Sequence, residues 1–107
     1  MKVRKPALAP LVRKWQRRLH LLDWDLTVKY IKVRPKPTDT FVGQCSANAD
    51  KNKATILILD PAVERHDVEA TLKHELLHVA LWLFVKEDPT ANRLEERFIE
   101  RIVPLLR

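Results

Sequence analysis

A run of five residues, His74-Glu75-Leu76-Leu77-His78, places three polar side chains inside one of the most apolar stretches of the chain. Residues four apart lie one above the other on a helix, so both imidazoles can reach a single metal ion. Neutral imidazole nitrogen is a good ligand for Zn²⁺, and Glu75 falls beside the pair, where its carboxylate can accept a proton from water. The spacing therefore predicts a zinc site with His74 and His78 as ligands and Glu75 as the general base.

A chance match is the alternative, because the H-E-x-x-H pattern fixes only three positions and a long helix can carry surface histidines. The apolar sequence around the motif argues against chance, since a buried imidazole or carboxylate without a partner is costly. A metal ion would supply that partner. We therefore favour the metal site over a metal-free helical scaffold in which the motif is a coincidence.

A catalytic zinc site needs a third protein ligand. No histidine or cysteine follows His78 in the sequence, so a downstream ligand must be a carboxylate, and the candidates are Glu95, Glu96 and Glu100. On a helical wheel Glu95 lies in the middle of the apolar face, whereas the other two point toward solvent. Glu95 is the predicted third ligand, and a buried ion pair with Arg or Lys is the alternative for it.

Hydrophobic periodicity predicts the elements that position these side chains. Alternating apolar residues indicate strands within 23–33, 40–49 and 54–60, and the last two are expected to form an antiparallel hairpin with 54–60 as the more central strand. A long helix from about 68 to 86, capped by Asp67, carries the motif, and a final helix over 91–103 carries the glutamates. Spacings of three and four predict an amphipathic N-terminal helix, with the stripe Leu8, Leu11, Trp15, Leu19 and Leu22.

The order of these elements and the composition predict one α+β domain, residues 1–107, with a small sheet of three or slightly more strands on a helical layer. Of the 107 residues, 46% are hydrophobic and 32% charged, as in globular proteins. The single cysteine, Cys45, cannot form an intrachain disulfide, and the N-terminus lacks a signal-peptide pattern. The longest apolar run, Val79 to Val85, is far shorter than the ~20 residues of a membrane span. We expect a cytoplasmic protein.

Positive charge is concentrated near the N-terminus. The net charge is +6, and residues 1–36 hold eleven of the twenty Lys and Arg but only two of the fourteen Asp and Glu. Such a segment can attract nucleic acid, or it can be the solvated face of a helix, which is the more common case. No RNP motif or Cys/His finger accompanies it. A non-enzymatic zinc-containing module that contacts nucleic acid through this segment is the alternative to an enzyme.

With these residues and motifs the chain resembles the smallest zincin metallopeptidases of the gluzincin type, and the short predicted metallopeptidases of phage and bacterial mobile elements. The matching pieces are Gly43-Gln44-Cys45, the strand ending in "LDP", the H-E-L-L-H motif and Leu94-Glu95-Glu96. The resemblance implies a zincin-like fold in which His74, His78 and Glu95 bind Zn²⁺ and Glu75 is the base of a hydrolase. It also implies that the strand at Gly43, Gln44 and Cys45 binds a peptide substrate as an added strand.

The sequence departs from larger relatives of these peptidases in two ways. The metzincin signature requires Gly and His at positions where Leu81 and Phe84 stand, so that branch is excluded. Larger gluzincins use a later histidine or tyrosine to stabilise the oxyanion, and no histidine follows the motif. Tyr30, His66 and His20 are the remaining candidates, and each is more often a packing or surface residue. Cys45 is not interpreted as a nucleophile, because no local feature lowers the pKa of its thiol.

Overall fold

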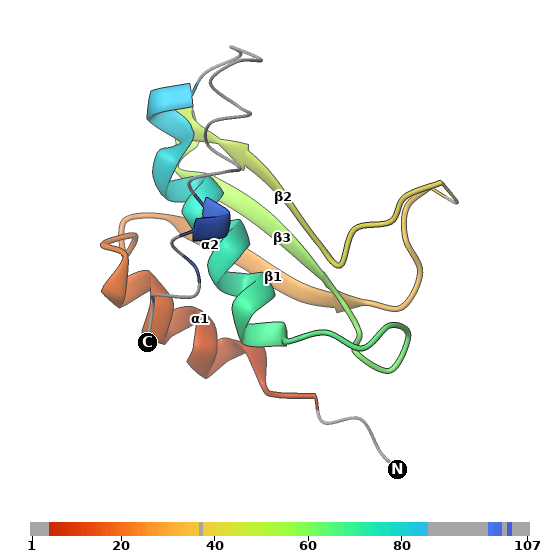
Figure 1. The fold of residues 1–107 in the computed structure, drawn as a ribbon. Helices are drawn as coiled ribbons and strands as arrows, with labels where there is room; N and C mark the ends of the chain where they lie inside the picture. Colours follow the sequence, from red (N-terminus) through yellow and green to blue (C-terminus); the bar gives the residue numbers. More distant parts are fainter. Residues whose placement is uncertain (1–4, 37, 86–98, 102, 104–107) are drawn as a thin grey trace.

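The computed structural model describes residues 5–36, 38–85, 99–101 and 103 (Figure 1). The predicted α+β order is confirmed for the described residues, and residues 99–101 are helical. Residues 91–98 and 102 of the predicted C-terminal helix, including Glu95 and Glu96, lie outside the described residues. The elements are α1 Leu8–Arg18, β1 Asp25–Ile31, β2 Gly43–Asn48, the 3₁₀ turn η1 Ala49–Lys51, β3 Lys53–Leu59 and α2 Val68–Val85.

The three strands form one mixed sheet in the order β1-β3-β2. β2 runs antiparallel to β3, with Gly43 opposite Ile58, which confirms the predicted hairpin. β1 runs parallel to β3, with Asp25 opposite Lys53. The central place of β3 follows from its composition, because Ile56 and Ile58 face the helices and the strand is bonded on both edges.

One face of the sheet is covered by helices, α2 over β2 and β3, and α1 over β1 (Figure 1). Side chains of β1 and β2 alternate between half-buried and exposed, as expected when only one face is covered. The core between the layers is formed by large side chains from both, and burial of each stabilises the fold by about 1.5–3 kcal/mol. Its fully buried members include Trp15, Ile56, Ile58, Leu72 and Leu76.

The N-terminal helix ends earlier than its apolar stripe predicted. Leu22, the last residue of that stripe, is 64% exposed, so its assignment to the buried face was wrong. His20 adopts a φ of 57°, and the N–H of Leu21 donates to the carbonyl of Gln16 at 2.8 Å. This is a Schellman closure with histidine in the left-handed position usually held by glycine. The closure turns the chain away from α1 before Leu22 can reach the core.

A buried indole links α1 to the start of α2. Trp15 is 1% exposed, and its Nε1–H donates to Glu69 Oε2 at 2.8 Å. Lys14 Nζ lies 2.9 Å from the same oxygen. The hydrogen bond from Lys14, followed by that from Trp15, holds the pKa of the Glu69 carboxyl below its ordinary value. Glu69 therefore serves as the shared acceptor between the two helices.

Replacing Glu69 should destabilise the fold in two graded steps. Glu69→Ala leaves the buried indole N–H without an acceptor and should lower the free energy of unfolding by about 1–3 kcal/mol at neutral pH. Glu69→Gln keeps an acceptor and should cost less than about 1 kcal/mol, because the lost ion pair is partly exposed. Because the pKa of Glu69 is depressed on folding, the gap between wild type and Glu69→Gln should close as pH falls from about 5 to about 3. Urea titrations across this range measure it, and a gap that widens toward acid would contradict the assignment.

Candidate metal centre

Helix α2 places Glu75 at the border of its core-facing side and the two histidines further round the helix. The helix begins where Asp67 Oδ1 accepts the N–H of Ala70 at 3.1 Å, so the predicted cap is confirmed. Leu72 and Leu76 are fully buried against the sheet. At 3.6 residues per turn, the histidines lie well round from these leucines, and Glu75 falls between the two stripes. This rotation explains why Glu75 is 7% exposed whereas both histidines are only half-buried.

The three motif side chains converge. One ligand atom from each of His74, Glu75 and His78 can be chosen so that all three lie within 4.8 Å of one another. The two imidazole rings have centroids 5.0 Å apart and are inclined at 62°. Two nitrogens bound to one tetrahedral zinc stand about 3.3 Å apart, so small side-chain rotations would bring the imidazoles to a shared ion. Two imidazoles and a carboxylate are a donor set that fits Zn²⁺.

Glu75 is packed against the only glycine of the chain. A Cβ built on Gly43 would lie 3.2 Å from Glu75 Cγ and 2.5 Å from Thr71 Cγ2. The absent side chain thus lets α2 approach the first residue of β2 closely. The Glu75 side chain is therefore packed against the first residue of β2. The predicted contact of Gly43 with a substrate stays a prediction.

Gly43→Ala should destabilise the protein by about 1–3 kcal/mol through overpacking. Thr71 cannot easily yield, because a β-branched side chain is stiff at χ1 and its hydroxyl donates to the carbonyl of Asp67 at 3.0 Å. Adding Thr71→Ser removes the clashing methyl, keeps the hydroxyl, and should recover most of the lost stability. Denaturant unfolding of the single and double variants measures this coupling.

Ser46→Ala, on the exposed side of the same strand, is the matched control and should change stability by less than about 0.5 kcal/mol. Equal losses with and without Thr71→Ser would show that the methyl of Thr71 is not the obstacle.

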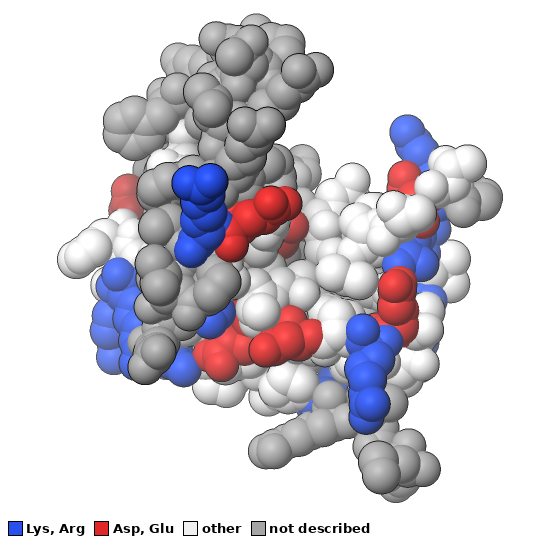
Figure 2. Space-filling model, in the orientation of Figure 1, with Lys and Arg blue, Asp and Glu red and all other residues white. Residues whose placement is uncertain are grey.

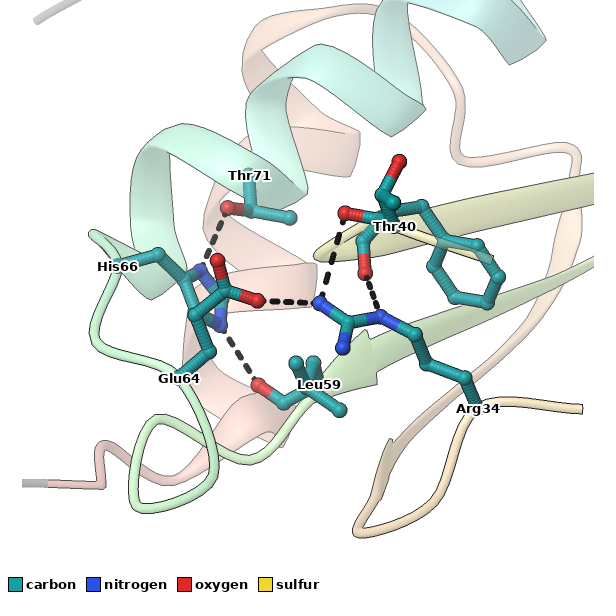
Figure 3. Close-up of polar contacts among 7 residues, drawn as sticks. Arg34, Thr40, Leu59, Glu64, His66 and Thr71 are labelled. Carbon is teal, nitrogen blue, oxygen red and sulfur yellow. Dashed lines mark hydrogen bonds and ion pairs between the residues drawn. The ribbon is translucent and has the colours of Figure 1, made fainter. Parts of the chain in front are cut away.

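Two clusters of polar contacts, one around His66 and one around Arg34, hold the loops near Gly43 and Thr71 (Figure 3). His66 Nε2 donates to the carbonyl of Leu59 at 2.6 Å, and its Nδ1 lies 2.8 Å from Thr71 Oγ1. Arg34 Nε donates to the carbonyl of Phe41 at 2.8 Å, and its Nη2 forms an ion pair with Glu64. These contacts tie the segment entering β2 to the segment leaving β3. Those of Arg34 make this link, whereas those of His66 join the segment after β3 to α2.

β2 is an edge strand of the described sheet, next to α2. The N–H of Leu59 donates to the carbonyl of Val42 at 2.8 Å, so these two residues form a hydrogen-bonded pair. In an antiparallel ladder such pairs alternate with pairs whose backbone groups point outward. Gly43 and Cys45 therefore direct their N–H and C=O groups toward the outer edge. Their side-chain positions face α2, whereas Gln44 lies on the opposite, exposed face.

A pocket of about 430 Å³ opens beside the motif, between the entry to β2, the first turns of α2 and residues 100 and 103. Glu100 is exposed, as predicted, and it also lines this pocket. Among the described residues, the converging group consists of the three motif residues, and Glu100 is not part of it. The lining residues are Phe41, Val42, Gly43, Ala70, Thr71, His74, Glu75, Glu100 and Val103.

The three candidates for stabilising the oxyanion, Tyr30, His20 and His66, lie in different surroundings, and none of them lines the pocket. The Tyr30 hydroxyl donates to the carbonyl of Pro6 at 2.5 Å, and burial together with the charge of Asp60 raises its pKa. His20 closes the C-terminus of α1. His66 contacts the helix that carries the motif, through the hydrogen bond between its ring and Thr71 Oγ1.

Sequence reasoning missed two residues that shape the site, Thr71 and Arg34. Thr71 stands one helical turn before Glu75, and this spacing could have placed it on the same face of the helix. Arg34 carries no comparable signal, because Glu64 is 30 residues away in the sequence and Phe41 is linked to Arg34 by no helical or strand spacing. Its role could not be found from spacing.

No model of a known protein family matches the chain, and comparisons with curated proteins and with solved structures give no match. The resemblance to small zincins therefore stays a prediction made from the motifs. Within the part of the chain that the structure describes, no helix is both long and apolar enough to cross a membrane.

Proposed function

We propose that this protein is a zinc-dependent metallopeptidase. The observation that carries the proposal is the convergence of His74, Glu75 and His78 on one side of α2, beside the edge strand β2. The two histidines give ligands for zinc, the buried Glu75 gives a carboxylate that can act as a base, and the strand edge gives backbone groups for a peptide. A hydrolase of peptide bonds uses all three together.

In this proposal each side chain of the motif has a separate task. His74 and His78 hold the metal through one ring nitrogen each. A bound Zn²⁺ would polarise the scissile carbonyl and lower the pKa of water toward about 7. Glu75 accepts the proton of the attacking water at its carboxylate and passes it to the leaving amine nitrogen. Gly43 lies against the Glu75 side chain and would limit its movement by packing.

Glu95 is the proposed third ligand. On the helix that the sequence predicts, it stands four residues before Ile99, and residues four apart share one helix face. Ile99 is fully buried, and its neighbour Glu100 is exposed. This orientation matches the helical wheel on which Glu95 belongs to the apolar face. A carboxylate on such a face needs a cationic partner, and a metal ion bound by two histidines can serve.

A peptide substrate is proposed to bind along the outer edge of β2. Gly43 and Cys45 offer outward backbone groups there, so that main-chain hydrogen bonds would give affinity that is largely independent of sequence. Gln44 offers no outward backbone group, because it pairs with Leu57 of β3, and its side-chain position lies on the opposite face of the sheet from the motif. Its predicted contact with a substrate therefore has less support than those of Gly43 and Cys45.

Metal analysis of tag-free protein tests this proposal first. After dialysis against zinc and then against metal-free buffer, we expect about one zinc ion per chain, and slow cleavage of an unfolded protein substrate that stops on chelation. Protein that retains no zinc would rule out the site. Protein that retains zinc and cleaves no unfolded substrate would rule out the peptidase.

A zinc-containing module that binds nucleic acid is the second candidate, and the charge of α1 favours it. Figure 2 shows Lys and Arg side chains gathered over α1. Four exposed basic residues of that helix, Arg13, Lys14, Arg17 and Arg18, contribute to this surface. Binding through it should weaken steeply with salt, by about one power of salt concentration per phosphate contact. Under this alternative, Glu75→Gln would leave binding unchanged.

A further inference from the structure

We propose that the 430 Å³ pocket beside Glu75 selects substrates with a long basic side chain, lysine or arginine, and that Glu100 is the residue that recognises its charge. This inference rests on the proposed peptidase function and adds a specificity-determining residue to it. It comes from the shape and the charge of the pocket lining.

The size and walls of the pocket suit a long side chain. Its volume falls within the roughly 300–1,000 Å³ of pockets that enclose small ligands. Phe41, Val42 and Val103 give it apolar walls. The methylene stem of a lysine or arginine can pack on such walls while its charged head stays at a polar rim.

The charge of the lining then favours a cation at that rim. Among the described lining residues are two carboxylates, Glu75 and Glu100, and no lysine or arginine. Glu75 is buried and belongs to the motif, whereas Glu100 is exposed. Glu100 is therefore the carboxylate that an entering cation would meet. The same charge repels an acidic side chain, so the pocket discriminates by repulsion as well as by attraction.

The pocket also lies close to the proposed chemistry. His74 and Glu75 form part of its lining, and Gly43, the first residue of the edge strand, forms another part. A peptide paired with that edge would therefore run past the mouth of the pocket. The pocket can therefore bind the substrate side chain that lies nearest the scissile bond.

Peptides that differ at a single position, Lys, Arg, Leu or Glu, test the inference in two assays. Cleavage is measured with zinc-loaded protein, and binding is measured with the zinc-loaded Glu75→Gln variant. Wild type should prefer Lys and Arg over Glu in both. Glu100→Gln should reduce the preference for Lys over Leu about threefold to fivefold, as expected for a partly exposed ion pair. Glu100→Lys should reverse the order, so that Glu is favoured over Lys.

Asp50→Asn is the matched control, because it removes an exposed carboxylate from η1, outside the pocket, and should leave the preferences unchanged. Preferences that do not respond to Glu100 variants, or that respond equally to Asp50→Asn, overturn the inference while peptide cleavage stands. Binding that follows Glu100 without any cleavage by wild type overturns the peptidase and supports the pocket. A wild type that neither binds nor cleaves these peptides overturns both.

Discussion

Glu75→Gln is expected to slow peptide hydrolysis about 10²–10⁴-fold while the protein keeps its zinc. The substitution replaces a carboxylate with an amide of the same shape, which cannot accept the proton of the attacking water. The side chain is 7% exposed and lies against Gly43, so an isosteric amide can keep its place in the packing. The rate constant for cleavage of a fluorogenic peptide, measured beside zinc content, gives the result.

Asp50→Asn makes the same chemical change at an exposed position away from the motif and should hydrolyse the peptide at the wild-type rate. A Glu75→Gln protein that keeps both zinc and most of its activity would remove Glu75 from the role of general base. Loss of zinc together with activity would instead assign Glu75 to metal binding, which its place in the converging group also permits.

Removing either histidine should have the second large effect, on metal binding itself. His74→Ala or His78→Ala leaves too few ligands for a stable zinc site and should weaken zinc affinity by more than the 10–100-fold that loss of an outer-shell partner costs. In wild type, zinc at 100 times its dissociation constant should add about 2.7 kcal/mol to the free energy of unfolding. For a domain of this size that corresponds to a rise of roughly 10–20 °C in Tm, which either variant should lose at the same zinc concentration.

His20→Asn is the matched control for this experiment. His20 lies at the end of α1 with a φ of 57°, a conformation that asparagine tolerates. The variant removes one histidine but should keep the zinc-dependent rise in Tm. If His20→Asn loses that rise and His78→Ala keeps it, the ion is bound elsewhere.

The parts of the fold that could be predicted are those that local patterns determine. Helix α2 was expected from about 68 to 86 and is observed over Val68–Val85, because its cap at Asp67 and its long apolar run act within the helix itself. The hairpin of β2 and β3 was predicted for the same reason, since a short turn joins two adjacent strands. The convergence of His74 and His78 follows from helix geometry alone.

The parts that could not be predicted depend on contacts between distant segments. The parallel pairing of β1 with β3 joins strands that β2 separates in the chain, and no local pattern specifies it. The end of α1 was misjudged because a histidine takes the left-handed position where glycine is the usual signal. The contact of Gly43 with Thr71 and Glu75 needed the register of a strand against a helix. Glu95 lies outside the described residues, so the third ligand stays a prediction.

The packing of α2 on the sheet determines where each part of the proposed site lies. α2 packs its apolar side on the sheet, which turns the two histidines outward and leaves Glu75 at the border of the core. The edge of β2 lies beside that border, with Gly43 as the point of contact. The proposed base, the two proposed histidine ligands and the strand edge therefore come from one helix and one strand, whereas the proposed third ligand, Glu95, comes from neither.

A crystal structure of zinc-loaded, tag-free protein, with anomalous data collected at the zinc absorption edge, tests the central claim most directly. We predict one strong anomalous peak, with nitrogens of His74 and His78 at about 2.0–2.1 Å and a carboxylate oxygen of Glu95 at about 2.0–2.2 Å. A peak that lies away from both histidines, or imidazoles that point apart around no metal, would contradict the claim.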